Sequence, residues 1–285
     1  MKVLLEYNSL KSNKINYDSL NGLLALNNII LDKKFGISII LIFVISILTG
    51  EAFAAQNNNL SILSTVLKWL PLILKGFMMN LLVSILSMAI GTAGGFALGI
   101  GNVSLSKSIR KICWLLTQFF RNAPWLVLVF YTIALIPFEV KVGPYLIPFP
   151  GWLKATIGLS LPVMANTAEI VRGGIQSISI GQWEAAESLA FSRFKTLRSI
   201  ILPQCIKRMI PPWMNLYAIL TTASPLISLV GVYDALLMTR SALMAEGRSE
   251  LLLPMYSILL IIFFLYCYPI AYFTVKLERR FAVKI

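Results

Sequence analysis

The sequence predicts an all-α integral membrane protein with six transmembrane helices, and three observations lead to this class. Of the 285 residues, 58% are hydrophobic and only 13% are charged, whereas soluble domains carry about 25% charged residues. Residues 76–106, 209–233 and 251–275 contain no charged side chain, and each run exceeds the roughly 20 residues that a helix needs to cross a bilayer. The basic residues, which produce a net charge of +13, cluster beside the ends of the apolar runs. That placement indicates a lipid membrane, not nucleic acid, as the partner of these charges.

The expected spans cover, in chain order, about residues 37–53, 72–102, 112–136, 153–171, 210–232 and 252–275. With the N-terminus in the cytoplasm, the cytoplasmic segments hold 18 Lys and Arg residues, against 6 on the opposite side. Because Lys and Arg accumulate on the cytoplasmic side, we expect both termini there. The polar stretch 1–35 has an amphipathic patch near residues 20–31 that favours an interfacial helix. A signal peptide cleaved near residue 54 is a disfavoured alternative, because the polar lead before it is long.

Enzymatic chemistry is not expected of this chain. It contains no histidine, which excludes His-based zinc sites and Ser/His/Asp or Cys/His catalysis. The three cysteines, Cys113, Cys205 and Cys267, are too widely spaced for a CxxC site. No GxxxxGK[ST] loop is present to hold nucleotide phosphates. We therefore expect no catalytic residue, metal site or cofactor.

The longest cytoplasmic loop, residues 172–208, has the pattern of two short helices. Gly181 precedes a helix-favouring run over 182–190. Ser192 can cap a second helix over 193–202, which we expect Pro203 to end. Helical spacing places Phe194, Leu197 and Ile201 on one apolar face. On amphipathicity alone, the loop would rest against a partner or on lipid headgroups.

The residue pattern of this loop indicates a function more specifically than its amphipathicity does. It resembles the EAA loop of ABC importer permeases in Glu184-Ala185-Ala186, Leu189, Phe194 and Ile201-Leu202-Pro203. Three further segments resemble the permeases for polar amino acids, of the histidine/glutamate/glutamine/arginine type: Arg121-Asn122-Ala123-Pro124-Trp125, Ser224-Pro225-Leu226-Ile227-Ser228-Leu229-Val230-Gly231 and Leu277-Glu278-Arg279-Arg280. The resemblance covers about residues 65–282 in collinear order, so the first 60 residues lie outside it.

This resemblance implies a five-helix type I ABC importer core, here with one additional N-terminal helix. Residues 1–60 would then hold a cytoplasmic segment and the additional helix, and 61–285 the permease domain with its EAA coupling loop at 172–208. The implied partners are a second permease, two cytoplasmic ATPase subunits that bind ATP and Mg, an external substrate-binding protein and an amino-acid substrate. The permease would lie in the bacterial inner membrane. The short helix of its cytoplasmic loop would dock on the ATPase. The residues carried over for this coupling are Gly181, Glu184, Ala185, Ala186, Leu189, Arg193 and Phe194.

The sequence also departs from the family pattern. Ala190 stands where the family has a glycine, and a left-handed turn there would cost a residue with a Cβ about 1 kcal/mol. Asn122 and Ala123 replace the Gly and Thr of the family's R-G-T-P segment, and Thr222-Ala223 replaces a Lys-Asp pair. These departures favour a heterodimer of unequal permeases over a homodimer.

Polar residues inside the expected spans are candidates for the substrate path, namely Arg121, Asn122, Ala123, Pro124, Asn166 and Glu169. An intramembrane arginine should face a bundle interior or a wet cavity, and Pro124 would free backbone carbonyls in a broken helix. Structural alternatives remain open: Arg121 could bind backbone carbonyls, Asn166 could bond another helix, and Glu169 could pair with Arg172.

The stripe of Gly91, Gly94, Gly95 and Gly99 favours helix packing over ligand contact. Glu169 is the one acidic residue within the five family spans, so the path favours acidic or neutral polar amino acids over cationic ones. A secondary amino-acid transporter or channel subunit is the alternative function, although neither requires an EAA loop.

Overall fold

The computed structural model describes residues 62–142 and 145–281, together with residue 45. The expected first span, 37–53, the interfacial helix and the cleavage alternative fall outside these residues, apart from Ile45. The described chain is mainly helical, as the composition predicts.

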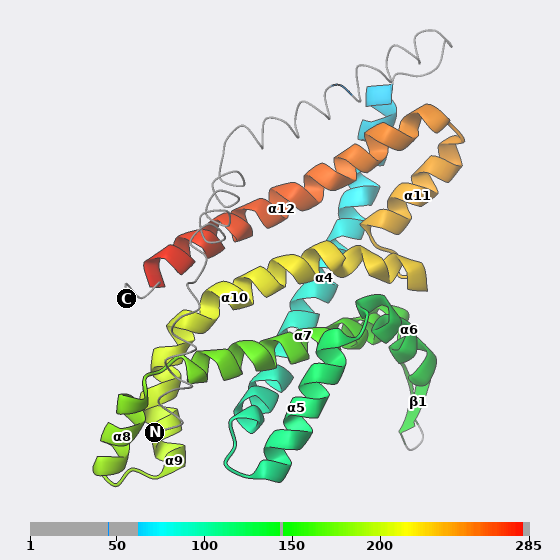
Figure 1. Cartoon of the computed structure of the whole chain (residues 1–285). Helices are drawn as coiled ribbons and strands as arrows, with labels where there is room; N and C mark the ends of the chain where they lie inside the picture. Colours follow the sequence, from blue (N-terminus) through cyan, green and yellow to red (C-terminus); the bar gives the residue numbers. More distant parts are fainter. Residues whose placement is uncertain (1–44, 46–61, 143–144, 282–285) are drawn as a thin grey trace. The chain divides into compact units, whose positions relative to one another are not determined.

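The long helix α4 (Ile62–Asn102) passes behind α7 (Gly151–Gln176) and α10 (Leu202–Ala223) in Figure 1. Its glycines permit close packing on α7: a Cβ at Gly91 would lie 2.5 Å from Val163, and one at Gly95 would lie 2.5 Å from the Met164 carbonyl oxygen. The interpretation of the glycine stripe as a packing surface is therefore confirmed.

The helix α4 begins ten residues before the expected start of its span. It runs through Pro71 and carries Lys68 in this added part, and Lys75 follows shortly after it, so a search for uncharged runs missed the start of the helix. Proline is compatible with a helix where neighbouring groups satisfy the freed backbone.

The expected span 112–136 is not one helix. It consists of α5 (Lys107–Asn122) and α6 (Trp125–Leu135), which are bent by 106° at their junction. Proline disfavours a helical conformation in the residue before it, and Ala123 is extended in front of Pro124. An antiparallel hairpin follows α6 and was not predicted. It consists of β1 (Glu139–Val142) and β2 (Tyr145–Pro148).

The expected stop at Pro203 is wrong. The helices α8 (Ile180–Ser188) and α9 (Arg193–Thr196) confirm the helix–turn–helix of the loop, but α9 continues through a π turn, η1 (Leu197–Ile201), directly into α10. Pro203 lies in the first turn of α10, directly after this π turn, and proline is tolerated in the first turn of an α-helix.

The C-terminal part contains η2 (Ser224–Val230), α11 (Ala235–Glu246), η3 (Ser249–Leu251) and α12 (Leu252–Phe281). One hydrophobic cluster joins α4, α11 and α12 around Ile73 and Met255. A second joins α4, α6, α7 and α10 around Leu159 and Leu220. A third, around Ile175 and Cys205, holds the loop helices against the ends of α7 and α10.

The helix α11 is attached to α4 at both ends. At its start, the backbone N–H of Ala235 donates to Asn80 Oδ1 at 2.9 Å, and Asn80 Nδ2 donates to Asp234 Oδ2 at 3.1 Å. At its end, Glu246 accepts hydrogen bonds from Lys68 and from the indole of Trp69. These two bonds hold the pKa of the Glu246 carboxyl below its ordinary value.

Three helical stretches among the described residues are long and apolar enough to cross a membrane, namely Ile62–Asn102, Arg193–Val230 and Ser249–Arg280. The bent pair α5–α6 could form a fourth. The helix α7 is not among these stretches; it carries Lys154, Glu169 and Arg172, and it is enclosed by α4, α5, α6 and α10. An enclosed helix needs little lipid-facing apolar surface.

Candidate functional site

The junction of α5 and α6 determines where Arg121 lies. This residue is the last but one of α5, and the chain turns sharply at the extended Ala123. The broken helix that Pro124 predicts is therefore present. Asn122 bonds within its own helix, where its amide donates to the Gln118 carbonyl oxygen at 2.7 Å.

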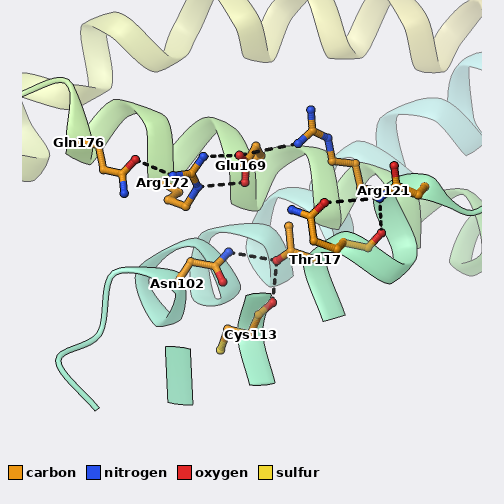
Figure 2. Close-up of polar contacts among 9 residues, drawn as sticks. Asn102, Cys113, Thr117, Arg121, Glu169, Arg172 and Gln176 are labelled. Atoms are coloured by element: carbon orange, nitrogen blue, oxygen red, sulfur yellow. Dashed lines mark hydrogen bonds and ion pairs between the residues drawn. The ribbon is translucent and has the colours of Figure 1, made fainter. Parts of the chain in front are cut away.

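Three charged side chains form an ion chain between α5 and α7: Arg121, Glu169 and Arg172 (Figure 2). Glu169 accepts two hydrogen bonds from Arg172, one of them at 3.1 Å from Nε, and lies 3.7 Å from Arg121 Nη1. Arg172 also donates to Gln176. The pairing of Glu169 with Arg172 considered from the sequence is thus present, with a second cation beside it.

A cavity of about 280 Å³ lies next to this ion chain. It brings together three of the expected path residues, Arg121, Asn166 and Glu169, and is completed by residues of α7 and α10: Ile170, Pro212, Asn215, Leu216 and Ile219. The other three expected residues, Asn122, Ala123 and Pro124, are not among its lining residues and lie at the bend between α5 and α6. The interhelical bond considered for Asn166 is not formed, because its amide donates to the Pro162 carbonyl oxygen within α7.

Sequence reasoning missed Asn215, which reaches this cavity from α10. A signal was available, since an uncharged but strongly polar side chain stands in the long apolar run 209–233. The lining has one cation, one anion and two amides, and its other side chains are apolar. Such a set can bind the charged or polar ends of a small zwitterion by ion pairs and hydrogen bonds.

The turn between α8 and α9 is a Schellman motif with an alanine in the position that glycine usually occupies. Phe191 N–H bonds the Ala186 carbonyl oxygen at 3.0 Å, and Ala190 N–H bonds that of Glu187 at 2.8 Å. Ala190 is left-handed, with φ of 54°. The strained turn predicted at this departure from the family glycine is confirmed.

The expected coupling residues differ in exposure. Six of them are exposed, namely Gly181, Glu184, Ala185, Leu189, Arg193 and Phe194. Ala186 is 1% exposed and packs inside the chain, so close approach of another helix would occur at Ala185. Phe194 is 71% exposed and does not share the buried face of Ile201, contrary to the expected apolar stripe.

Side chains from both loop helices stabilise the turn. The Arg193 guanidinium stacks on the Trp183 ring at 3.9 Å, and Ser192 Oγ accepts the Lys195 N–H at 3.4 Å, which confirms the expected cap. Within residues 62–142 and 145–281, no group of three or more His, Cys, Asp or Glu side chains could hold a metal ion.

Comparison with known families gives a match over most of the chain. Residues 91–283 match the family described as binding-protein-dependent transport system inner membrane component. A Bacillus subtilis protein, the probable amino-acid ABC transporter permease protein YckA, is 35% identical over 212 residues, which are 74% of this chain and 90% of that protein. The putative glutamine transport system permease protein GlnP of Rickettsia conorii is 31% identical over 64% of this chain and 81% of its own length.

Solved structures share the fold. One, a crystal structure of an amino acid ABC transporter with histidines, has a TM-score of 0.65 and 24% identity over 78% of this chain and 99% of its own. A structure of the MetNI methionine ABC transporter has a TM-score of 0.59 and 14% identity over 75% of this chain and 98% of its own. At these identities the likeness extends to the arrangement of the helices.

Proposed function

The chain belongs to the family of binding-protein-dependent transport system inner membrane components, and on that premise we propose that it imports acidic or neutral polar amino acids. Membership makes it a multi-pass inner-membrane permease of an amino-acid ABC transporter, which works with a partner permease, an external binding protein and a separate ATPase. Substrate charge, the coupling contacts and the partner's identity are the proposed parts.

The charge of the ion chain carries the proposal on substrate. Arg121 and Arg172 share the single carboxylate of Glu169, which leaves a surplus positive charge beside the cavity. A substrate carboxylate can neutralise that surplus, whereas a Lys or Arg side chain would meet repulsion from Arg121 and no free acid. The glutamine named for the Rickettsia relative is a neutral polar amino acid, which agrees with this class.

Uptake competition in vesicles that hold the assembled transporter tests substrate charge. Excess glutamate or glutamine should inhibit uptake more strongly than arginine or lysine. Arg121→Ala should raise the KM for glutamate about tenfold, which corresponds to the loss of one charge-assisted contact. Arg280→Ala, the same change at the exposed end of α12, is the control. Inhibition by the basic pair alone would refute the proposed substrate class.

The proposed coupling surface consists of the exposed residues on α8, on α9 and on the turn between them. Leu189 and Phe194 expose 68% and 71% of their surface, and a partner protein would remove this apolar area from water. Glu184→Lys should abolish substrate-stimulated ATP hydrolysis while the permease still inserts. Glu278→Lys places the same change at the end of α12 and should have no effect. Normal stimulation in Glu184→Lys would place the contact elsewhere.

We also propose the arrangement that the sequence predicts: six helices with both termini in the cytoplasm, the permease domain over 61–285 and an N-terminal helix within 1–60. A heterodimer is the proposed assembly, supported by Ala190 at the glycine position of the coupling turn. Two differently tagged copies of this chain should then fail to co-purify, whereas a homodimer would yield both tags in one complex.

A further inference from the structure

A second cavity, of about 630 Å³, lies between the end of α4, the first half of α5 and the end of α7. Its lining is strongly basic, because α5 contributes Lys107, Arg110 and Lys111 and α7 contributes Arg172. Glu169 is the one acid in the lining, and it is already bound by Arg172. The cavity therefore has a surplus of positive charge that an anion can neutralise.

Asn102 also lines this cavity, and its amide oxygen is buried without a hydrogen-bond partner among the described residues. Asn102 is 5% exposed, and its Nδ2 donates to Thr117 Oγ1 at 3.0 Å (Figure 2). The Thr117 hydroxyl gives its single proton to the Cys113 carbonyl oxygen at 2.8 Å, so it must accept from Asn102. This fixes the orientation of the amide, and Asn102 Oδ1 is left without a hydrogen bond among the described residues.

The two features require different groups on one ligand. The lysines and arginines favour a phosphate or another compact anion. Asn102 Oδ1 is an acceptor only, so it favours a hydroxyl or ammonium donor on the same molecule. Because buried polar groups are normally paired, a ligand that supplied both groups would complete the site.

The position of the cavity points to lipid as the source of this chemistry. Lys107, Arg110 and Lys111 lie at the end of α5 that the charge bias assigns to the cytoplasm. Trp114, one turn further along α5, lines the cavity and is 53% exposed. Tryptophan is enriched at membrane–water interfaces, and basic cavities between transmembrane helices on this side suit anionic headgroups.

We propose that this cavity binds the headgroup of an anionic glycerophospholipid that carries a free hydroxyl, such as phosphatidylglycerol. The phosphate lies against Lys107 and Lys111, and a headgroup hydroxyl donates to Asn102 Oδ1. This inference rests on the proposed cytoplasmic position of the start of α5. It concerns the α4–α5 side of α7, whereas the cavity proposed for substrate is completed by α10, and Glu169 lines both cavities.

The test measures lipid bound to the complete purified transporter by native mass spectrometry during titration with phosphatidylglycerol. Lys107→Gln/Lys111→Gln should weaken binding of one lipid per permease roughly thirtyfold, because each lysine near an anionic headgroup contributes about fivefold. Arg110 is left intact, since it donates to the Ser104 carbonyl oxygen. The matched control is Lys207→Gln/Lys276→Gln, the same charge change at exposed positions outside the cavity.

Two further arms separate lipid from free phosphate and from plain charge attraction. Glycerol 3-phosphate in solution should not displace the lipid, and zwitterionic phosphatidylcholine should not compete for it. Equal lipid loss in the cavity and control variants, or displacement by glycerol 3-phosphate at equal concentration, would overturn the proposal.

Discussion

Two groups of polar residues, both buried at least in part, are used in opposite ways. At the α4–α11 junction, Asn80 and Asp234 are fully buried, and the hydrogen bonds between them and to the start of α11 are complete. In the ion chain between α5 and α7, Arg121 and Glu169 are 43% and 23% exposed and border cavities. Asn80 and Asp234 expose no surface to a ligand, whereas the ion chain borders two cavities.

The contrast separates polar groups that stabilise the fold from those free to bind something else. A buried group whose partners are all within the chain costs free energy when any one partner is removed. A half-exposed ion pair contributes about 0–1 kcal/mol to stability, so it can exchange partners at little cost. Burial and completeness of bonding, more than residue type, therefore distinguish the ion chain, as the candidate functional site, from the junction.

Replacing the carboxylate of Asp234 or of Glu169 by an amide should have different effects at the α4–α11 junction and in the ion chain. Both oxygens of Asp234 accept hydrogen bonds, from Leu237 N–H at 2.9 Å and from Asn80. In Asp234→Asn an amide nitrogen would face one of these donors, at a cost of about 3 kcal/mol. Glu169→Gln should change stability by less than about 1 kcal/mol.

Thermal unfolding of the purified complexes compares the two variants, and uptake measurements complete the pair. Glu169→Gln should assemble normally but alter uptake kinetics, because Arg121 and Arg172 lose their shared anion. Equal destabilisation by both changes would mean that the ion chain is structural.

A smaller effect is expected from filling the space at the same junction. A Cβ on Gly76 would lie 2.7 Å from the Ala235 nitrogen and from the Asp234 carbonyl oxygen. Since these are backbone atoms, α4 and α11 would have to separate, and Gly76→Ala should cost about 2 kcal/mol.

Gly173→Ala is the matched control for this change. Gly173 is also helical, and beyond the neighbouring backbone of its own helix an added Cβ would meet no described atom within 4 Å. Alanine there should stabilise the complex by up to about 1 kcal/mol through helix propensity. Destabilisation of similar size at both glycines would show that helix packing at the junction is looser than the contacts imply.

The sequence predicted most of the helices because apolar runs and charge spacing reflect the membrane environment directly. It failed where the tertiary structure overrides that pattern. At the start of α4, Lys68 forms an ion pair with Glu246. The helix α7 is enclosed by other helices. The sequence predicted a helix end at Pro203 because proline usually interrupts a helix. In the structure, the helix continues through a π turn and Pro203 lies directly after it.

Contacts within the site were predicted only where the residues are close in sequence. Glu169 and Arg172 are three apart on one helix, so their pairing follows from spacing. Arg121 and Asn215 reach the same cavity from other helices, and no spacing rule connects them. Ala190 is the reverse case, because a departure from a family glycine predicted local backbone strain that the turn contains.

The smallest prediction concerns that strain and extends the comparison to the coupling turn. Ala190→Gly should stabilise the complex by about 1 kcal/mol, because glycine adopts φ of 54° without a Cβ clash. Ala185→Gly is the control on the neighbouring helix, where alanine has normal helical geometry and glycine should cost about 1 kcal/mol. Thermal unfolding of both variants gives the sign of each effect.

Because the turn is exposed and its bonds are local, the gain should leave the α4–α11 junction unchanged, as measured by hydrogen exchange at the Ala235 amide. A loss of stability in Ala190→Gly would mean that the alanine methyl makes a compensating contact, and that the turn is selected for rigidity.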